Sequence, residues 1–264
     1  MDGTALIGRT GRTVAISNQK GGVGKTTTAI NLAASLAALD RKVLLFDLDP
    51  QANATSGLGF ARGGDGANAY DVISGTAAAE AIRPTPFPNL SLLPSGRDLV
   101  GAEIELVGEA DREQRLRFAL EPVRGAFEFI LIDCPPSLSL LTVNALSAAD
   151  SVLIPIQTEY FALEGVTELM ETIERVRAAF NPELSIEGVV LTMYDDRTNL
   201  ARQVTEDIRA HLGEKVYETI IPRNVRLGEA PSYGKPVLAY DIKSRGAEAY
   251  LSLAREFLKR RAAS

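Results

Sequence analysis

Short apolar runs alternate with longer segments of helical periodicity along most of this 264-residue chain. Several of these runs are largely apolar, for example "KVLLFD" at 42–47 and "FEFILID" at 127–133. Strands of that composition are covered on both faces, as in a mostly parallel sheet that lies between helices. The alternation therefore predicts an α/β fold with a doubly wound, mostly parallel sheet flanked by helices.

The predicted elements fit one compact domain. We predict strands at 13–17, 42–47, 90–94, 127–133, 151–156, 186–192 and 215–221. We predict helices at 26–39, 97–121 in two pieces, 139–148, 163–180, 199–212 and 245–261. Residues 1–12 are expected to form a flexible tail, 13–264 a single domain, and 59–68 a surface loop.

Composition excludes several classes of protein. The N-terminus lacks the apolar run of a signal peptide, and "CPPSLSLLTVNALSAA", before Asp150, is too polar and proline-rich for a membrane span. The single cysteine, Cys134, excludes an internal disulfide and fits a reducing compartment. We therefore expect a cytoplasmic protein in which Cys134 is a small buried residue rather than a ligand or nucleophile.

A glycine-rich loop, "GGVGKT" at 21–26, joins the first predicted strand to the first predicted helix. Glycines let the backbone approach a phosphate chain, and the loop N–H groups and the helix N-terminus point at the anion. In such a loop Lys25 reaches the β- and γ-phosphates, and the Thr26 hydroxyl binds Mg²⁺. The loop predicts a P-loop NTPase fold with nucleotide-binding residues Gly21, Gly22, Val23, Gly24, Lys25, Thr26 and Thr27.

A second lysine, Lys20, departs from the usual loop pattern. That pattern begins with a glycine at the position of Gln19, and Lys20 follows it. A lysine at the mouth of the loop faces away from its own γ-phosphate. It is either a solvated charge or a group that serves the nucleotide of another subunit.

Three aspartates are expected near the phosphates. Asp47 and Asp49 lie at the end of the second predicted strand, two apart so that both carboxylates point the same way, and Asp133 ends "FILID". Ligands of open α/β sheets bind at the carboxyl ends of strands. A helix cap or turn remains the alternative role for Asp47. No residue resembles a strong general base, and His211, the only histidine, is expected at the surface of a late helix.

Four motifs in order resemble one family. "KGGVGKT", "LLFDLDPQANAT", "FILIDCPPS" and "IPRNVRLGEAPSYGKPV" are similar to those of the ParA/Soj chromosome- and plasmid-partitioning ATPases, over nearly the whole chain from residue 13. The resemblance implies ATP and Mg²⁺ as cofactors and catalytic roles for Lys20, Lys25 and Asp49. Lys20 would act in trans in a homodimer that closes over two ATP molecules.

The resemblance also implies roles for the remaining site residues. Asp49 would hold the attacking water, Asp47 would support the metal shell, and Asp133 would hold Mg²⁺ through water, with Thr26 as a metal ligand. Pro222, Arg223 and Asn224 would lie against the adenine. Hydrolysis would be slow and accelerated by a ParB/Spo0J-type protein bound at centromere-like DNA.

An uneven charge distribution suggests DNA as a second partner. The net charge is −6, but residues 197–264 carry 13 Lys and Arg against 8 Asp and Glu, a local charge of +5. Contacts to phosphates would be insensitive to base sequence and strongly salt-dependent, and dimerisation would double them. A solvated surface charge is the alternative for each candidate. The candidates for non-specific double-stranded DNA binding at the nucleoid are Arg197, Arg202, Arg223, Arg226, Lys243 and Arg245.

Other classes of protein contain a similar glycine-rich loop. A MinD-like membrane-associated ATPase needs a basic amphipathic C-terminal helix, and Leu251, Ala254 and Leu258 form an apolar stripe just before "KRR". The same stripe suits a helix docked on the sheet, and "AAS" replaces the expected bulky apolar tip, so we expect docking and no membrane partner. A nitrogenase-type iron protein needs two cysteines per subunit. A small-molecule kinase would not explain Lys20.

Overall fold

The computed structural model describes residues 11–159 and 162–262. Its strands form one seven-stranded sheet in the order β3-β4-β2-β5-β1-β6-β7, in which every pair is parallel except β3 with β4. The predicted doubly wound, mostly parallel fold is therefore confirmed. The strands are β1 (Arg12–Ile16), β2 (Val43–Asp47), β3 (Arg83–Pro84), β4 (Leu90–Leu93), β5 (Phe129–Asp133), β6 (Ser151–Gln157) and β7 (Ser185–Thr192).

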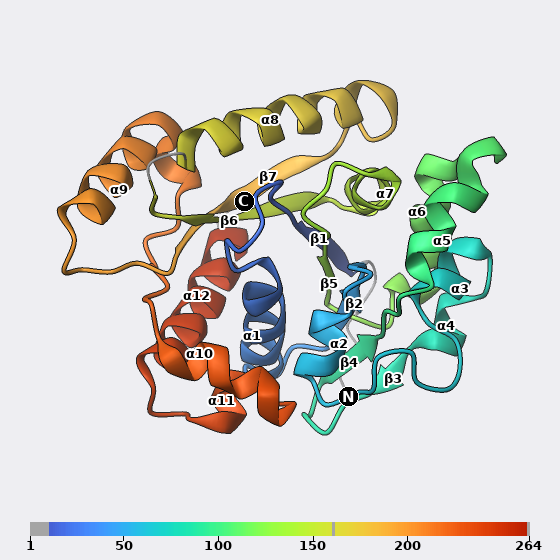
Figure 1. Ribbon diagram of the computed structural model, residues 1–264, viewed down its shortest axis with the longest axis horizontal. Coiled ribbons are helices and arrows are strands. Elements are labelled where there is room, and N and C mark those ends of the chain that lie inside the picture. The colour runs from blue at the N-terminus through green and yellow to red at the C-terminus, as the bar shows by residue number, and fades with distance from the viewer. Residues whose placement is uncertain (1–10, 160–161, 263–264) are drawn as a thin grey trace, which may run out of the picture.

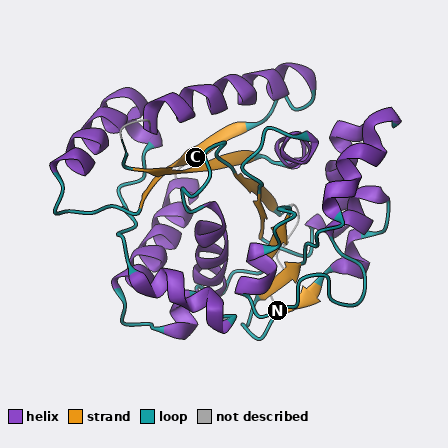
Figure 2. Ribbon diagram, viewed as in Figure 1, coloured by secondary structure: helices purple, strands orange, loops and turns teal. Residues whose placement is uncertain are grey.

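Helices cover both faces of the sheet (Figure 1), and the colouring of Figure 2 separates these helical layers from the strands. On one face lie α1 (Lys25–Ala38), α2 (Asn53–Gly57), α10 (Val225–Glu229), α11 (Val237–Tyr240) and α12 (Arg245–Ala262). On the other lie α3 (Ala69–Ser74), α4 (Ala78–Ala81), α5 (Leu99–Glu105), α6 (Arg115–Arg124), α7 (Leu140–Ala148), α8 (Ala162–Ala179) and α9 (Asn199–Leu212).

The central strands are buried on both sides, as their composition predicts. In β2, Val43 and Leu45 pack with the α1 layer, while Leu44 and Phe46 pack with the opposite layer. All four side chains are fully buried. The two-residue alternation of a strand thus divides one apolar run between two cores.

The last helix, α12, packs against β5 and α1. Phe257 is fully buried and meets the Phe129 ring edge-on at 5.3 Å, and the Tyr250 hydroxyl hydrogen-bonds Thr28 of α1 over 3.1 Å. The predicted docking of this helix is therefore confirmed. The predicted apolar stripe is only partly right, because Ala254 is buried but Leu251 and Leu258 are only partly buried. The buried face consists of Gly246, Ala247, Tyr250, Leu253, Ala254 and Phe257. Among the described helices, none combines the length and apolar character that crossing a bilayer requires.

The predicted strand at 215–221 is wrong. This segment runs beside β7, but in it only Val216 makes an isolated bridge, to Val189; Pro222, just beyond the segment, makes another to Tyr194. The reason lies in α12, where the Glu256 carboxylate accepts the Glu218 and Thr219 N–H groups over 2.8 and 2.9 Å. Backbone donors bound to a side chain cannot extend a ladder.

Two further expectations need adjustment. Residues 11 and 12, expected in the tail, belong to the fold, because β1 begins at Arg12 and Gly11 is buried; residues 1–10 lie outside the described residues. The short helices α2, α3, α4, α10 and α11 and the strand β3 were not expected, because segments of two to six residues show no clear period. The loop at 59–68 is confirmed as irregular and largely exposed.

Candidate nucleotide-binding site

The glycine-rich loop lies between β1 and α1, at the carboxyl edge of the sheet. Gly22 and Gly24 have φ values of 75° and 86°, which residues with a Cβ rarely adopt. Gly24 caps α1 without a side-chain hydrogen bond to the first-turn N–H groups, and a Cβ added at Gly21 or Gly22 would meet nothing within 4 Å. The exposed donors and the open space suit an anion at this helix N-terminus.

Lys25 is buried inside this loop. Its Nζ donates to the Lys20 carbonyl oxygen over 2.9 Å, so the ammonium is held under the loop backbone. Burial lowers the pKa of Lys25, while the nearby Asp133 carboxylate opposes that change. The loop is anchored from behind, because the Thr192 hydroxyl at the end of β7 donates to the Val23 carbonyl over 2.8 Å.

Asp133 and Asp47 end adjacent strands and are paired in register. Asp133 is fully buried, and neither of its oxygens accepts a hydrogen bond from the described part of the chain. Burial and the neighbouring Asp47 charge raise the pKa of Asp133 well above its usual range. The Thr26 hydroxyl, which is near but outside hydrogen-bond geometry, and the Lys25 ammonium only partly offset this rise. An orphaned buried carboxylate is a group that requires a cationic partner.

The donor set fits a magnesium ion held chiefly by phosphates and water. Within residues 11–159 and 162–262, no three His, Cys, Asp or Glu side chains cluster in a way that could hold a metal ion. Mg²⁺ keeps several waters and is commonly held by one or two protein oxygens together with substrate phosphates. The hydroxyl of Thr26 and the free oxygens of Asp133 match that requirement.

Asp47 has a different environment from Asp133. Its Oδ2 accepts the Thr55 N–H and the Thr55 hydroxyl, each over 2.7 Å, and its Oδ1 accepts the Asp49 N–H over 3.2 Å. Burial raises the pKa of Asp47 to about 6, although these three hydrogen bonds oppose the rise. Both oxygens are thus committed to the turn between β2 and α2, which favours the turn role over the predicted role in the metal shell.

Asp49 lies in that turn, nearly buried at the carboxyl end of β2. Its Oδ1 accepts the Gln51 N–H over 2.9 Å, and its carbonyl accepts the Ala52 N–H over 2.8 Å. Ala52 has a φ of 52°, an uncommon conformation for a residue with a side chain, and it immediately precedes α2. The backbone around Asp49 is therefore held at several points.

Lys20 points away from the phosphate loop of its own chain. Its Nζ lies 2.9 Å from Glu159 Oε2, just beyond β6, and the two side chains are 38% and 48% exposed. Gln157 Nε2 donates to the other oxygen of Glu159 over 2.6 Å. Lys20 is thus a half-exposed cation on the rim of the site, where a group from outside the subunit can reach it.

The segment at 222–224 lies at the same edge. Its backbone is tied to Tyr194, two residues beyond β7, because the Arg223 N–H donates to the Tyr194 carbonyl over 2.9 Å. Asn224 caps α10 by accepting the Arg226 N–H. Next to this helix, a cleft of about 560 Å³ opens beside Thr26 and Thr27 and is lined also by Asn53, Ser56 and Leu227. The cleft provides space for a nucleotide next to the loop.

The basic residues of the C-terminal third are interleaved with acids. Arg197 pairs with Asp195 over 2.6 Å, and Arg245 lies 3.8 Å from Asp196. Arg226 contacts both Glu229 and Asp241, at 2.7 and 3.3 Å. Arg202 donates to Asn199 over 2.8 Å. The positive charge of residues 197–264 is therefore partly neutralised. Two of the neutralising acids, Asp195 and Asp196, precede that range.

Several residues of the site were not expected from the sequence. Glu159 lies in none of the quoted motifs, Thr55 ends the motif "LLFDLDPQANAT" but was given no role, and Ser95 bonds the Thr55 hydroxyl from beyond β4. Cys134 is buried as expected, and burial raises the pKa of its thiol, which makes it a poor nucleophile. His211 is exposed on α9, also as expected.

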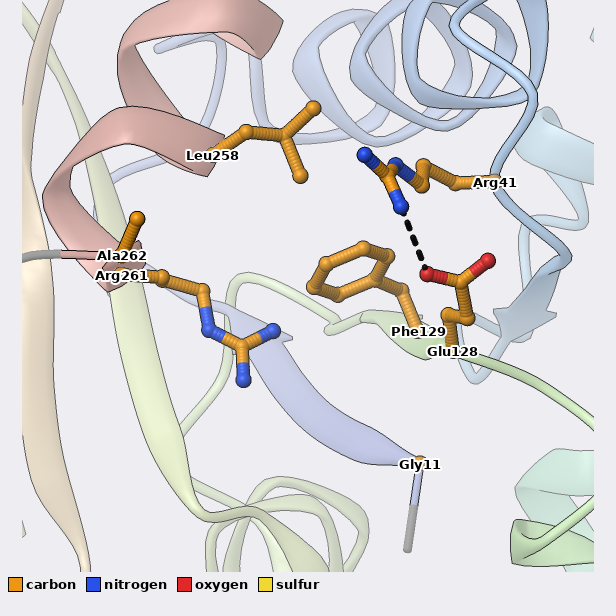
Figure 3. A pocket seen from close by; sticks show the side chains of 7 residues that line it. All are labelled: Gly11, Arg41, Glu128, Phe129, Leu258, Arg261 and Ala262. Carbon is orange, nitrogen blue, oxygen red and sulfur yellow. Dashed lines mark hydrogen bonds and ion pairs between the residues drawn. The ribbon is translucent and has the colours of Figure 1, made fainter. Parts of the chain in front are cut away.

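A separate pocket lies at the opposite edge of the sheet (Figure 3). It has a volume of about 200 Å³, and Gly11 and Phe129 mark the amino ends of β1 and β5 on its wall. Arg41 and Glu128 form an ion pair of 3.2 Å across it, and the Arg261 guanidinium lies 4.9 Å from the centre of the Phe129 ring. Because the phosphate loop lies at the carboxyl ends of the strands, this pocket is not part of the candidate site.

Three comparisons relate the chain to known proteins. A family profile described as an AAA domain matches residues 11–186. The chain is 58% identical to the chromosome partitioning protein ParA of Caulobacter vibrioides, with 94% of each chain covered. It is 54% identical to the sporulation initiation inhibitor protein Soj of Bacillus subtilis, covering 93% of this chain and 98% of that protein. A Mycobacterium smegmatis structure described as cobyrinic acid a,c-diamide synthase with bound ATP analogue and magnesium is 38% identical, with a TM-score of 0.84 and 96% of each chain covered.

Proposed function

Because the chain belongs to the ParA/Soj family of chromosome-partitioning ATPases, we propose that it binds ATP with Mg²⁺ and hydrolyses it to ADP and phosphate as a switch for DNA segregation. The observation that carries the nucleotide site is the glycine-rich loop at the end of β1, with Lys25 buried beneath it and Asp133 unpartnered beside it. Residues Gly21–Thr27 would surround the phosphates, and Pro222, Arg223 and Asn224 would lie against the adenine. We further propose that residues 13–264 act as one ATPase domain.

In this proposal the chain supplies alignment and charge rather than covalent chemistry. When bound, Mg²⁺ neutralises phosphate charge and orients the phosphates; the Thr26 hydroxyl would hold it directly and Asp133 through water. Lys25 holds the β- and γ-phosphates, and Asp49 orients the attacking water. Phosphoryl transfer passes through a loose transition state, so these groups need to be positioned accurately but need not be strong bases.

We propose that Lys20 acts across a homodimer in which two subunits close over two ATP molecules. The position of Lys20 supports this, since its Nζ is half-exposed at the rim and is paired with Glu159 rather than with its own loop. A cation delivered by a partner is useful only when phosphate is present, so the nucleotide state would set the oligomeric state. Glu159 would release Lys20 when the subunits close.

We propose that the same dimer binds DNA and a partner protein. Arg197, Arg202, Arg223, Arg226, Lys243 and Arg245 would contact phosphates of double-stranded DNA without reading bases, and a dimer would present two such sets. A ParB/Spo0J-type protein would accelerate slow hydrolysis and return the chain to a monomer. The protein would then be located in the cytoplasm on the nucleoid.

The decisive experiment measures mass by light scattering with a non-hydrolysable ATP analogue and Mg²⁺, followed by titration with DNA or with liposomes. We expect a dimer that binds DNA with ATP and not with ADP, and no binding to liposomes. Lys20→Ala should retain nucleotide affinity but lose the dimer. A monomer at saturating analogue would contradict the proposed switch, and binding to liposomes would instead support the MinD-like alternative.

A further inference from the structure

The turn that carries Asp49 is held by a buried hydrogen-bond relay that joins three elements. Thr55, on α2, donates its hydroxyl to Asp47 Oδ2 at the end of β2 over 2.7 Å. The same hydroxyl oxygen accepts the Ser95 N–H, two residues beyond β4, over 2.9 Å. Thr55 is fully buried, so these bonds are shielded from water.

In the relay the Thr55 hydroxyl both donates and accepts. A hydroxyl has one proton to donate, and here it goes to the Asp47 carboxylate, because the Ser95 group that bonds the same oxygen is a backbone N–H. The Thr55 N–H donates to the same Asp47 oxygen. Thr55 therefore donates two hydrogen bonds to the Asp47 carboxylate, and its hydroxyl oxygen accepts one from the segment after β4.

The other end of the relay reaches Asp49. Asp47 Oδ1 accepts the Asp49 N–H, so one carboxylate holds both the residue that begins the turn and the helix that ends it. Ala52, between them, has a φ of 52°. Backbone conformations of this kind persist where the surroundings over-determine them. The Ala52 N–H also donates to the Asp49 carbonyl, but Asp47 is the side chain that joins Asp49 to Thr55 on α2.

We propose that Thr55 is a positioning residue for ATP hydrolysis: through Asp47 it sets the place of Asp49 relative to the γ-phosphate. The inference rests on the proposed function, in which Asp49 orients the attacking water. It also assigns Asp47 to the support of Asp49 instead of to the metal. A displacement of about 1 Å in a catalytic group can reduce a rate by about 100-fold, so the relay acts on turnover.

The test compares Thr55→Val, which keeps the shape and removes the hydroxyl, with Thr55→Ser, which keeps the hydroxyl. We expect Thr55→Val to lower kcat by about 10- to 100-fold in single-turnover hydrolysis. The Kd for a fluorescent non-hydrolysable ATP analogue should stay within about threefold of the unmodified chain, because the phosphate loop is untouched. Thr55→Ser should recover most of the rate.

The matched control is Thr205→Val on α9, which removes a buried hydroxyl that bonds only the Ala201 carbonyl, over 2.7 Å. It should leave both kcat and Kd unchanged. If Thr55→Val does not fold, Thr55→Ala replaces it against the same serine variant.

Three results would overturn the positioning role: a kcat of the valine or alanine variant close to that of the unmodified chain, a loss of nucleotide affinity as large as the loss of rate, or no recovery with serine. Absence of turnover in the unmodified chain, by contrast, would overturn the proposed ATPase function itself.

Discussion

Two neighbouring carboxylates at the carboxyl edge of the sheet have opposite surroundings. Asp47 accepts three hydrogen bonds, whereas Asp133 accepts none from the described residues, although both are fully buried. An ionised buried group without partners costs free energy that only a cation can recover. Ionisation of Asp133 in the nucleotide-free site is therefore unfavourable, and a bound Mg²⁺ would offset that cost.

Asp133→Asn is expected to stabilise the nucleotide-free protein at pH 8 by about 1–3 kcal/mol, because it removes an unpartnered buried charge. The pKa of Asp133 is raised on folding, so its folded form holds a proton more tightly than its unfolded form. The contribution of Asp133 to stability is thus present at low pH and is lost as the pH rises through the folded pKa. The gain from asparagine should accordingly shrink towards low pH.

The measurement is urea unfolding of both chains without nucleotide at pH 5 and pH 8, together with Mg²⁺-dependent binding of an ATP analogue. Binding should weaken in the asparagine variant as stability increases. If Asp133→Asn is less stable than the unmodified chain at pH 8, the Asp133 carboxylate does not destabilise the folded protein.

At the scale of elements, two distant segments meet through glycines. The turn after α2 contains Gly59, and the 3-10 turn Ala230–Tyr233 ends at Gly234; their φ values are 85° and 63°. A Cβ on Gly234 would lie 2.5 Å from the Gly59 Cα. The backbones touch here because neither residue has a side chain, and this contact ties the Asp49 side of the site to the segment that follows α10.

Gly234→Ala is therefore expected to lower the free energy of unfolding by about 2 kcal/mol or more. The left-handed conformation alone costs a residue with a Cβ about 1–2 kcal/mol, and a backbone clash adds to that. Gly125→Ala is the control, since an added Cβ there meets nothing within 4 Å. Chemical denaturation of the three chains measures the effect, and equal stability of the two variants would refute the close approach.

The docking of α12 leads to a separate prediction. Phe257 is fully buried against Phe129, so Phe257→Ala should destabilise the protein by about 3–5 kcal/mol. Arg255→Ala, at an exposed position of the same helix, should change stability by about 0.5 kcal/mol or less. Thermal unfolding distinguishes the two. A neutral Phe257→Ala would mean that the helix is not held on the sheet, as the membrane alternative requires.

At the scale of the whole molecule, the phosphate loop and the candidate DNA-binding residues differ in how they are held. The phosphate loop is anchored through the Thr192 hydroxyl of β7, whereas the DNA candidates are exposed, and Arg197, Arg226 and Arg245 among them are paired with acids. Binding to DNA would have to exchange these ion pairs for phosphate contacts. Exposed pairs are worth about 0–1 kcal/mol each, so that exchange costs little.

Arg226→Ala should weaken ATP-dependent DNA binding for all sequences alike. Loss of one phosphate contact per subunit should reduce the slope of log K against log salt by about 2 per dimer. Arg175→Ala is the control, because Arg175 is an exposed arginine of α8 that also pairs with an acid, Glu171, at 3.8 Å. Titrations at several salt concentrations give both slopes. An unchanged slope for Arg226→Ala would exclude Arg226 from the interface.

Predictions from the sequence succeeded where the signal is local. Apolar runs located six of the seven predicted strands, and the spacing of glycines, Lys25 and Thr26 placed the loop between β1 and α1. The prediction of a strand at 215–221 failed because the carboxylate of Glu256, on α12, accepts the N–H groups of Glu218 and Thr219. The basic third was overestimated, because ion pairing with Asp195 and Asp196 is a matter of spatial arrangement.

The sequence by itself determined the layered α/β architecture, the phosphate loop and the family, because hydrophobic period and motif spacing act between near neighbours. Only the tertiary structure decided which of two similar aspartates is free to meet a metal, where Lys20 points, and that Thr55 and Ser95 support the turn that carries Asp49. Those features depend on hydrogen bonds between elements that are brought together only when the sheet forms, and no spacing along the chain encodes them.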